Sequence, residues 1–353
     1  MKVLFIYRNP AMGFSIGKVF KSIEVEMRKY GEVDSLELPC GNYTPLSMWY
    51  NIKTARRTAR KKHYDIVHIT GAEHYLLPFL KKENTVMTVH DLGFFTNHRL
   101  GLRAIKKYIL WIRTLPFATY VTFISEASKK ETLQLVPLNE EKYSVVPNPV
   151  GKEFVYSPKP INTDCPVILH VGTGENKNLE STVIALKGFP CKMRIVGNLT
   201  EGQKLILELY NISYEQVSNL SDKEILQEYV NCDYVNFPSL YEGFGMPIIE
   251  GQAIGRPVLT SNFPPMADIA NGSSMIVDPT KPEDIRRGYN DMKLQVEELV
   301  ERGIENVKRF AIEKITRQYF EIYRKITNKN HENRTLAKLP KPSPTAIYCS
   351  SIG

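Results

Sequence analysis

The stretch Pro238-Ser239-Leu240-Tyr241-Glu242-Gly243-Phe244-Gly245-Met246-Pro247-Ile248-Ile249-Glu250 places two acids around a glycine-flanked turn that leads into a helix. The residues before it, Tyr234–Phe237, read as a buried strand, and Pro247 suits the first position of a helix. A helix N-terminus flanked by glycines exposes unpaired backbone amides that can bind a phosphate. The two carboxylates can accept hydrogen bonds from hydroxyl groups. The stretch therefore predicts a strand, turn and helix that bind a phosphorylated, hydroxyl-rich ligand.

Strand-like and helix-like runs alternate along the whole chain, which is typical of parallel sheets covered by helices. A segment rich in proline and polar residues, 147–163, separates two series of runs and is the expected linker. Ligands of such sheets bind beyond the carboxyl ends of the strands, so two facing halves would enclose a cleft. The expected strands are 3–7, 33–38, 66–69, 86–89, 120–124 and 143–146 in the first half, and 167–171, 193–196, 234–237, 258–260 and 275–277 in the second.

The motif around Glu242 resembles that of the retaining glycosyltransferases of family 4, also called glycosyltransferase group 1. The family signature is a Glu, seven residues and a second Glu, with Gly-Phe-Gly after the first. Glu242 and Glu250 match it, and Gly-Arg-Pro-Val follows at 255–258. Two glutamates at this spacing would be ordinary on a solvated loop and helix, but the preceding strand and the following Gly-x-Pro-Val make the match specific. The resemblance extends to about residue 326 and is weakest in the first half.

The resemblance implies an α/β protein with the GT-B fold, in which two Rossmann-like domains face each other across a cleft. An acceptor-side domain is expected at 1–155 and a nucleotide-sugar donor domain at 164–310. In this family the last helices return to the first domain, so a helix over 311–327 is expected to cross back. The sequence becomes polar and proline-rich after Asn328, and residues 328–353 are expected to form a flexible tail.

The activity implied by the resemblance is the transfer of a sugar from a UDP- or GDP-sugar to an acceptor hydroxyl with retention at the anomeric carbon. The acceptor would be a saccharide or a lipid-linked saccharide, as in bacterial-type assembly of cell-surface polysaccharide or glycolipid. No metal or other cofactor is implied, and the chain lacks the Asp-x-Asp with which metal-dependent transferases hold a cation.

Two other classes are compatible with a sugar-nucleotide site. A non-catalytic partner of an active transferase would also bind the donor, but the intact motif residues argue against it, since a pseudoenzyme is free to lose them. A sugar-nucleotide epimerase on the same fold lacks support, because this Glu motif belongs to the transferases.

The resemblance assigns roles to the residues of the motif. Glu250 would hold the ribose hydroxyls of the donor. Glu242 would contact the donor sugar, either as a nucleophile or as a group that stabilises an oxocarbenium-like transition state. The backbone amides of Gly243, Phe244 and Gly245 would lie beside the donor.

The loop after the strand Val167–Val171 supplies further donor-binding candidates. Lys177 matches a family cation that clamps the diphosphate of the donor, which would stabilise the leaving group. At the neighbouring position the family often has Arg, which would be the second group that holds the diphosphate. This chain offers Asn176 or Thr173 there, and the sequence does not decide between them. A lone lysine beside a surface helix is usually only solvated, and the role of Lys177 depends on the Glu motif.

A histidine follows an expected strand of the first half. His90, in Thr-Val-His-Asp-Leu-Gly, matches the His-Asp of the family at the cleft, where its imidazole would reach a donor hydroxyl or a phosphate. His68 and His74 are weaker candidates, and a packed histidine is the simpler interpretation of both.

The loop 9–18 joins the first expected strand to the first helix, and its Gly13 matches the family position at which a glycine touches the donor phosphate. Gly17 and Lys18 in the same loop do not form a nucleotide-binding P-loop, because the remaining glycine spacing and the following Ser or Thr are missing.

Positive charge is concentrated in the first half. Residues 1–160 carry 24 Lys and Arg against 14 Asp and Glu, and the remaining residues carry 22 against 24. One basic patch lies at 53–62. A second, 103–113, interleaves cations with aliphatic and aromatic residues, as interfacial helices do, and predicts contact with an anionic membrane if the acceptor is lipid-linked. A half-buried helix with a wet basic face is the alternative. Nucleic acid is not expected, because no binding motif accompanies the charge.

No apolar run reaches the roughly 18–20 residues of a membrane-spanning helix. The apolar run near the N-terminus, 3–7, is too short for a secretory signal. A cytoplasmic protein is therefore expected, with peripheral contact to the inner face of the membrane. The five cysteines show no metal-ligand spacing and are expected to stay reduced.

Overall fold

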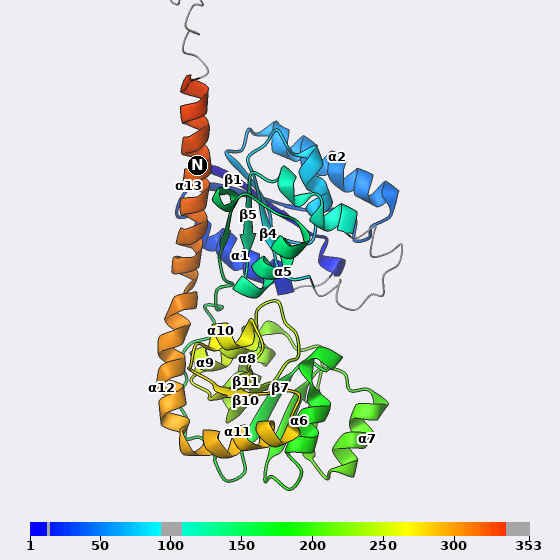
Figure 1. The fold of residues 1–353 in the computed structure, drawn as a ribbon, viewed down its shortest axis with the longest axis vertical. Helices are drawn as coiled ribbons and strands as arrows, with labels where there is room; N and C mark the ends of the chain where they lie inside the picture. Colours follow the sequence, from blue (N-terminus) through cyan, green and yellow to red (C-terminus); the bar gives the residue numbers. More distant parts are fainter. Residues whose placement is uncertain (13–14, 93–107, 337–353) are drawn as a thin grey trace, which may run out of the picture.

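The computed structural model describes residues 1–12, 15–92 and 108–336 of the 353-residue chain. Its strands form two separate six-stranded sheets, and every neighbouring pair of strands is parallel. The two sheets with their helices lie one above the other in Figure 1. The predicted α/β class, with two halves built on parallel sheets, is confirmed.

The first sheet has the strand order β2-β1-β3-β4-β5-β6. Its central strands β1, β3, β4 and β5 are almost entirely buried, because helices and loops cover both faces. The strands are β1 (Lys2–Tyr7), β2 (Glu32–Glu37), β3 (Ile66–Ile69), β4 (Thr85–Val89), β5 (Tyr120–Phe123) and β6 (Tyr143–Val145). The α-helices of this half are α1 (Ser15–Met27), α2 (Pro45–Lys61) and α5 (Glu126–Leu135), and its short helices are η1 (Pro10–Met12), η2 (His74–Phe79), η3 (Tyr108–Ile112), η4 (Leu115–Phe117) and η5 (Glu140–Lys142).

The second sheet has the strand order β12-β11-β10-β7-β8-β9. Its strands are β7 (Val167–Val171), β8 (Lys192–Val196), β9 (Ser213–Val217), β10 (Tyr234–Phe237), β11 (Val258–Ser261) and β12 (Met275–Val277). Its helices are η6 (Glu175–Lys177), α6 (Leu179–Ala185), α7 (Glu201–Leu209), α8 (Asp222–Asn231), α9 (Met246–Ile254), α10 (Met266–Ala270), α11 (Pro282–Leu294) and α12 (Val296–Val307). The sequence predicted five of these strands and missed β9, an edge strand of largely exposed polar residues.

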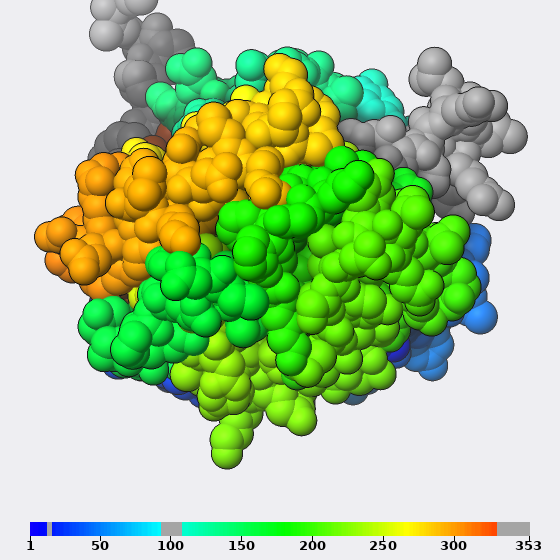
Figure 2. Space-filling view, turned by 90° about the horizontal axis from the view of Figure 1, so that it is seen from below, coloured from blue at the N-terminus to red at the C-terminus, as the bar shows by residue number. Residues whose placement is uncertain are grey.

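Figure 2 shows the end of the molecule formed by the second half. Yellow and orange residues of its last helices lie there beside green residues from the earlier part of the same half. Helix α11 packs against α6, and α12 packs against α9. These contacts close the core of the second half around Tyr234, Leu259 and Tyr289, which are completely buried.

The chain crosses between the halves twice, and the two crossings lie side by side. The amide of Val150, on the way out, donates a hydrogen bond to the carbonyl of Phe310, on the way back, at 2.9 Å. Helix α12 leads through η7 (Lys308–Phe310) into α13 (Ile312–Leu336), which runs along the side of the first half (Figure 1). The two crossings therefore meet at one place.

Helix α13 packs on α1 through an apolar stripe that includes Ile315, Tyr319 and Tyr323. The Tyr323 hydroxyl lies 2.5 Å from Nδ1 of the buried His68, whose Nε2 lies 2.8 Å from the Thr88 hydroxyl. The helix continues to Leu336, so its last turns fall in the range for which a tail is expected, and residues 337–353 lie outside the described part. No helix among the described residues combines the length and the apolar character needed to cross a membrane.

Candidate functional site

The predicted strand, turn and helix around Glu242 is confirmed. Strand β10 ends at Phe237, and α9 begins at Met246 with Pro247 in its first turn. Gly245 precedes the helix with a φ of +113°, a conformation that favours glycine. Within the described part of the chain, the amides of Gly243, Phe244 and Gly245 have no hydrogen-bond acceptor. They are therefore available to an anion, as expected of a helix N-terminus.

Glu242 is held by two residues of the loop after β7. Its Oε1 accepts hydrogen bonds from Lys177 Nζ at 2.5 Å and from Asn176 Nδ2 at 3.1 Å. Asn176 Nδ2 also donates to the carbonyl of Tyr241 at 3.0 Å, and Lys177 Nζ lies 5.0 Å from the centre of the Phe237 ring. The structure thus brings the first motif acid together with the expected diphosphate cation at the carboxyl end of the second sheet.

Thr173 lies in the same loop but makes different contacts. Its hydroxyl donates to the carbonyl of Asn198 at 2.7 Å, and its carbonyl accepts from Gln203 at 2.9 Å. Gly197, directly after β8, has a φ of +140°, and a Cβ there would lie 2.9 Å from Cγ2 of Thr173, so the two loops approach closely at this glycine. The Thr173 side chain is therefore tied to the loop after β8, whereas Asn176 points to Glu242.

Glu250 lies in α9 and is held by contacts of its own. Its Oε2 accepts a hydrogen bond from the Tyr229 hydroxyl of α8 at 2.7 Å. Burial raises the pKa of Glu250, while the bond from Tyr229 and the positive charge of Lys18 lower it, and the negative charges of Glu153 and Asp222 raise it further. The carboxyl group is thus fixed in orientation at the boundary between the halves.

His90 follows β4, as expected, and its ring is closely packed against neighbouring residues of the first half. Nε2 lies 2.8 Å from the carbonyl oxygen of Thr70, and the ring packs edge-on against Phe20. A Cβ on Gly71 would lie 2.7 Å from Cδ2 of this ring, so glycine is required there. Burial lowers the pKa of His90. Because a carbonyl oxygen only accepts, Nε2 carries the proton of the neutral ring, and Nδ1 is its acceptor atom.

The turn that carries Glu242 touches the first half directly. A Cβ on Gly243 would lie 2.9 Å from the carbonyl oxygen of His90 and 2.8 Å from Cβ of Asp91, so only glycine fits. The Ser125 hydroxyl, at the end of β5, donates to the carbonyl of Gly243 at 2.9 Å. The structure therefore brings His90 and the Glu242 turn together across the boundary.

Two further side chains, Tyr241 and Lys18, make contacts that join the halves near this site. The Tyr241 hydroxyl donates to Glu131 on α5 at 3.1 Å. Lys18 Nζ on α1 lies 2.9 Å from Asp222 on α8 and 3.2 Å from Glu153 in the linker. Sequence reasoning missed Ser125, Glu131 and Lys18 as bridging residues. Only Ser125 left a signal, because it follows a strand and caps a helix.

Three of the sequence expectations have a more limited outcome. Gly13 lies outside the described residues, as do Arg103, Lys106 and Lys107 of the basic segment. Phe244 is buried and its ring packs edge-on against Phe310, so only its backbone faces the site.

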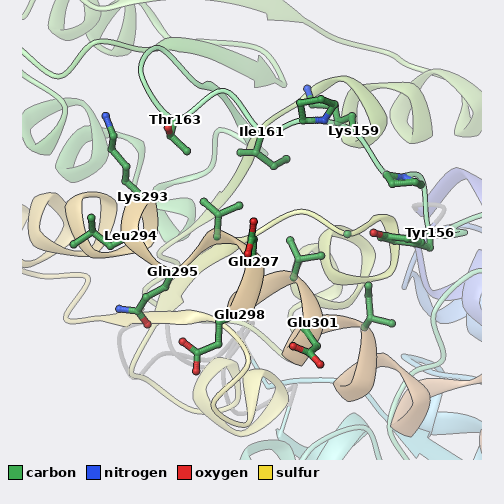
Figure 3. Close-up of a pocket in the computed structure, with 16 residues that line it drawn as sticks. Tyr156, Lys159, Ile161, Thr163, Lys293, Leu294, Gln295, Glu297, Glu298 and Glu301 are labelled. Atoms are coloured by element: carbon green, nitrogen blue, oxygen red, sulfur yellow. The ribbon is translucent and has the colours of Figure 1, made fainter.

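A cavity of about 920 Å³ lies elsewhere, between the linker and α12. Figure 3 shows Tyr156 and Lys159 of the linker on one side and Glu297, Glu298 and Glu301 of α12 on the other. None of the predicted site residues lines it. We therefore place the candidate site at Glu242, where the predicted residues come together.

Two family models together match residues 21–310 of the chain. Residues 21–154 match the family described as Glycosyltransferase Family 4, and residues 152–310 match the family described as Glycosyl transferases group 1. The two matches meet in the linker between the sheets.

Individual relatives agree with these matches. O-antigen chain mannosyltransferase B of Escherichia coli is 24% identical over 73% of this chain and 74% of its own length. The serotype-specific mannosyltransferase WbdA of Escherichia coli is 24% identical over 61% of this chain, which spans only 28% of that relative.

Solved structures share the fold at low identity. A sucrose-phosphate synthase from Thermosynechococcus elongatus superposes with a TM-score of 0.77 at 16% identity, covering 93% of this chain and 100% of its own. Anabaena HepE, solved with UDP and glucose, gives a TM-score of 0.68 at 15% identity, covering 91% of this chain and 99% of its own. The predicted GT-B fold and family are confirmed: the chain belongs to the glycosyltransferases of group 1, also called family 4.

Proposed function

We propose that this glycosyltransferase moves a sugar from a nucleotide-sugar donor to an acceptor hydroxyl, with retention at the anomeric carbon, in polysaccharide or glycolipid assembly. One observation carries the proposal: Glu242, Lys177 and the glycine amides converge at the carboxyl end of the second sheet, where the turn touches His90 of the first half. The similarity to O-antigen mannosyltransferases supports the process, and the UDP-bound neighbour supports a nucleotide donor.

The donor would lie along the second half. Its diphosphate would bind the amides of Gly243 to Gly245 and Lys177, because both present positive charge at one place. Its ribose would bind Glu250, whose carboxyl is already oriented by Tyr229. Thr173 and Asn176 would line the approach to the diphosphate and to Glu242 respectively. The first half, expected at 1–155, would present the acceptor, and the second, at 164–310, the donor.

The transfer replaces one bond at the anomeric carbon by another on the same face. The bond to the diphosphate oxygen breaks, the acceptor oxygen bonds to the carbon, and the acceptor proton passes to the leaving phosphate oxygen. The Glu242 carboxylate would stabilise positive charge that develops on the sugar ring. His90 would accept a hydrogen bond from a donor-sugar hydroxyl at Nδ1, since Nε2 faces the Thr70 carbonyl.

We also propose that the reaction needs no divalent ion, since Lys177 and the helix amides supply positive charge to the leaving group. Activity should persist in EDTA. A loss of turnover that added magnesium or manganese restores would contradict this part of the proposal.

The reaction is tested by incubating the protein with UDP-glucose, UDP-galactose, UDP-N-acetylglucosamine and GDP-mannose, with and without methyl glycosides as acceptors. We expect nucleotide release with one donor and, by NMR, a product with the anomeric configuration of that donor. Binding of a donor without turnover under any condition would indicate the non-catalytic partner instead. A product of opposite configuration would disprove retention.

A further inference from the structure

The loops that follow β1 and β3 lie side by side at the carboxyl end of the first sheet. The two strands pair in parallel, and the amide of Thr70 donates a hydrogen bond to the carbonyl of Ile6 at 3.0 Å. Arg8 directly follows β1, and Glu73 comes soon after β3. Both residues therefore lie at the end of the sheet where His90, bonded to the carbonyl of Thr70, meets the second half.

Glu73 presents a carboxyl oxygen that no other described residue satisfies. The residue is 2% exposed, and its Oε1 accepts a hydrogen bond from the Tyr43 hydroxyl at 3.4 Å. Its Oε2 is buried and has no hydrogen-bond partner. Buried polar atoms in proteins are almost always hydrogen-bonded, so an oxygen of this kind marks a place where a bound group is expected.

Arg8 presents a buried donor near this oxygen. Its Nε is buried and has no hydrogen-bond partner among the described residues. Burial raises the pKa values of Glu73 and Tyr43 and lowers that of His90, and the positive charge of Arg8 acts to lower all three. The guanidinium group is therefore close to each of these side chains.

The two side chains lie on the same face of the sheet. Along β1, Tyr7 packs in the core that includes α1, whereas Ile6 packs in the core on the opposite face. Because side chains alternate along a strand, Arg8 follows on the face of Ile6. Tyr43, which holds Glu73, packs against the same core as Ile6. An unpaired donor and an unpaired acceptor thus meet at one edge of the sheet.

Contacts among the loops hold this pair in place. The Asn9 side chain, next to Arg8, donates to the carbonyls of the two residues that follow β2, at 3.0 Å each. The Tyr43 ring packs edge-on against Trp111, with the ring centres 4.8 Å apart. Groups that are already anchored lose little freedom when a ligand binds, which favours affinity.

A hydroxyl group matches this pair better than an anion does. A hydroxyl accepts one hydrogen bond and donates another, so it can satisfy Nε of Arg8 and Oε2 of Glu73 together. Burial raises the pKa of Glu73 to about 7, so its carboxyl group is present near neutral pH both ionised and protonated, and a hydroxyl suits both forms. A phosphate or carboxylate only accepts hydrogen bonds, and ionised Glu73 would repel it.

We propose that Arg8 and Glu73 bind a hydroxyl group of a neutral acceptor saccharide. The assignment rests on the proposed function, because the pair lies beside His90 in the half that would present the acceptor. The bound hydroxyl would anchor the sugar ring, and a different hydroxyl of the acceptor would attack the anomeric carbon of the donor. The pair would therefore select an uncharged sugar over a phosphorylated sugar or a uronic acid.

Saccharide binding is tested without turnover, by NMR titration with the methyl glycosides of mannose, glucose, galactose and N-acetylglucosamine. At least one should bind, and one of its monodeoxy analogues should bind about 10- to 100-fold more weakly, as expected for loss of a hydrogen bond to a charged group. Methyl glucuronide and glucose 6-phosphate are the charged probes. Tighter binding of either charged probe, or no binding of any neutral glycoside, would overturn the proposal.

The role of Arg8 is tested by combining its variants with the weakened deoxy analogue. Arg8→Met should lose affinity for the intact glycoside and should bind the deoxy analogue equally well, because the hydrogen bond is then absent in both complexes. Arg8→Lys keeps the positive charge but lacks the Nε donor, so it should behave as Arg8→Met does. Arg57→Met, at an exposed arginine of α2, should bind as the unchanged protein does.

The role of Glu73 is tested with two substitutions. Glu73→Gln keeps a donor and an acceptor and should bind the glycoside nearly as well as the unchanged protein, whereas Glu73→Ala should lose the preference for the critical hydroxyl. If Glu73→Ala does not fold, the Arg8 series decides alone. Full preference for that hydroxyl in Arg8→Met would overturn the proposal and would mean that a structural water bridges Arg8 and Glu73.

Turnover separates this proposal from the proposed function. Glycoside binding that depends on Arg8, without transfer from any nucleotide sugar, would refute the transfer reaction and leave the saccharide site standing. Transfer by Arg8→Met with an unchanged KM for the glycoside would refute the saccharide site and leave the reaction standing.

Discussion

The contact between Lys177 and Glu242 joins a cation and an acid that the proposed reaction uses for different purposes. The lysine would face the diphosphate, and the acid would face the sugar. Their separation of 2.5 Å fixes both side chains next to the glycine amides before any ligand arrives. Preorganised charge of this kind contributes to catalysis because it needs little rearrangement during the reaction.

Glu242→Gln should therefore impair turnover more than donor binding. Glutamine keeps the size of the side chain and loses the negative charge near the anomeric carbon. We expect kcat to fall by about 100-fold or more, with a much smaller change in donor affinity. The control is Glu175→Gln, an exposed acid two residues before Lys177. Equal losses in kcat and in affinity would indicate a binding role for Glu242.

Glu250→Ala should weaken the binding of the nucleotide itself. Loss of hydrogen bonds between a charged carboxylate and the ribose is expected to cost about 1.5–3 kcal/mol in calorimetric titrations. Tyr229→Phe should produce a smaller loss, because it frees the carboxylate without removing it. Glu208→Ala, at an exposed site on α7, is the control. Unchanged affinity of Glu250→Ala for the donor would refute the ribose assignment.

Glu73 should make the stability of the fold depend on pH. Its side chain is buried after β3, and this burial raises its pKa from 4.5 to about 7. The folded chain therefore keeps this proton at pH values where the unfolded chain has lost it, so the free energy of unfolding falls as pH rises through that window. The loss amounts to up to about 3 kcal/mol.

Glu73→Gln should remove this part of the pH dependence. Urea unfolding at pH 4.5 and pH 8 measures the difference for each protein, with Glu140→Gln as an exposed control. A variant that loses as much stability between the two pH values as the unchanged chain would show that Glu73 is not the group responsible.

The motif predicted which residues gather at the turn, but not how they pair. The spacing of Glu242 from Gly243 and Gly245 sets the local geometry, because strand, turn and helix follow one another in sequence. The pairing of Glu242 with Lys177 and the approach of Ser125 depend on how β7 and β5 lie beside β10 and on how the halves meet. Those distances are tertiary, and no local pattern encodes them.

Strands that are buried on both faces could be predicted from the sequence, whereas an exposed edge strand could not. Strands such as β3 and β10 are apolar runs because both of their faces are covered. Strand β9 has the sequence Ser-Tyr-Glu-Gln-Val and lies at the edge of its sheet, where only one side pairs. Its polar composition resembles that of a loop, so its pairing with β8 is visible only in the structure.

The contact between Tyr323 and His68 should contribute to the stability with which helix α13 is held against the first half. Tyr323→Phe removes the hydroxyl that lies 2.5 Å from His68 Nδ1 and leaves that nitrogen buried without its partner. We expect the free energy of unfolding to fall by about 1–3 kcal/mol. Tyr50→Phe, on an exposed tyrosine, should have no measurable effect in the same denaturation experiment. Equal stability of Tyr323→Phe and the unchanged protein would contradict this account of how α13 is held.

Lys18 links the two halves of the molecule by its ion pairs with Asp222 and Glu153. Lys18→Gln should therefore widen the distribution of distances between the halves, as measured by spin labels on α2 and α7. Lys21→Gln is a matched control, because Lys21 lies on the same helix and pairs with Glu37 inside the first half. An unchanged distance distribution in Lys18→Gln would show that other contacts, such as Ser125 with Gly243, suffice.

Because Val150 and Phe310 are hydrogen-bonded neighbours, the second half can be exchanged between related proteins as one segment. The segment between these residues leaves the first half and returns to it at the same place, so the second half is topologically an insert whose two ends lie side by side. Inserted modules with neighbouring ends are readily exchanged, because the host needs no rearrangement to accept them. A chimaera with the corresponding segment of a relative needs only two junctions, and it would join the half that we propose to bind the donor in one protein to the half that we propose to present the acceptor in another.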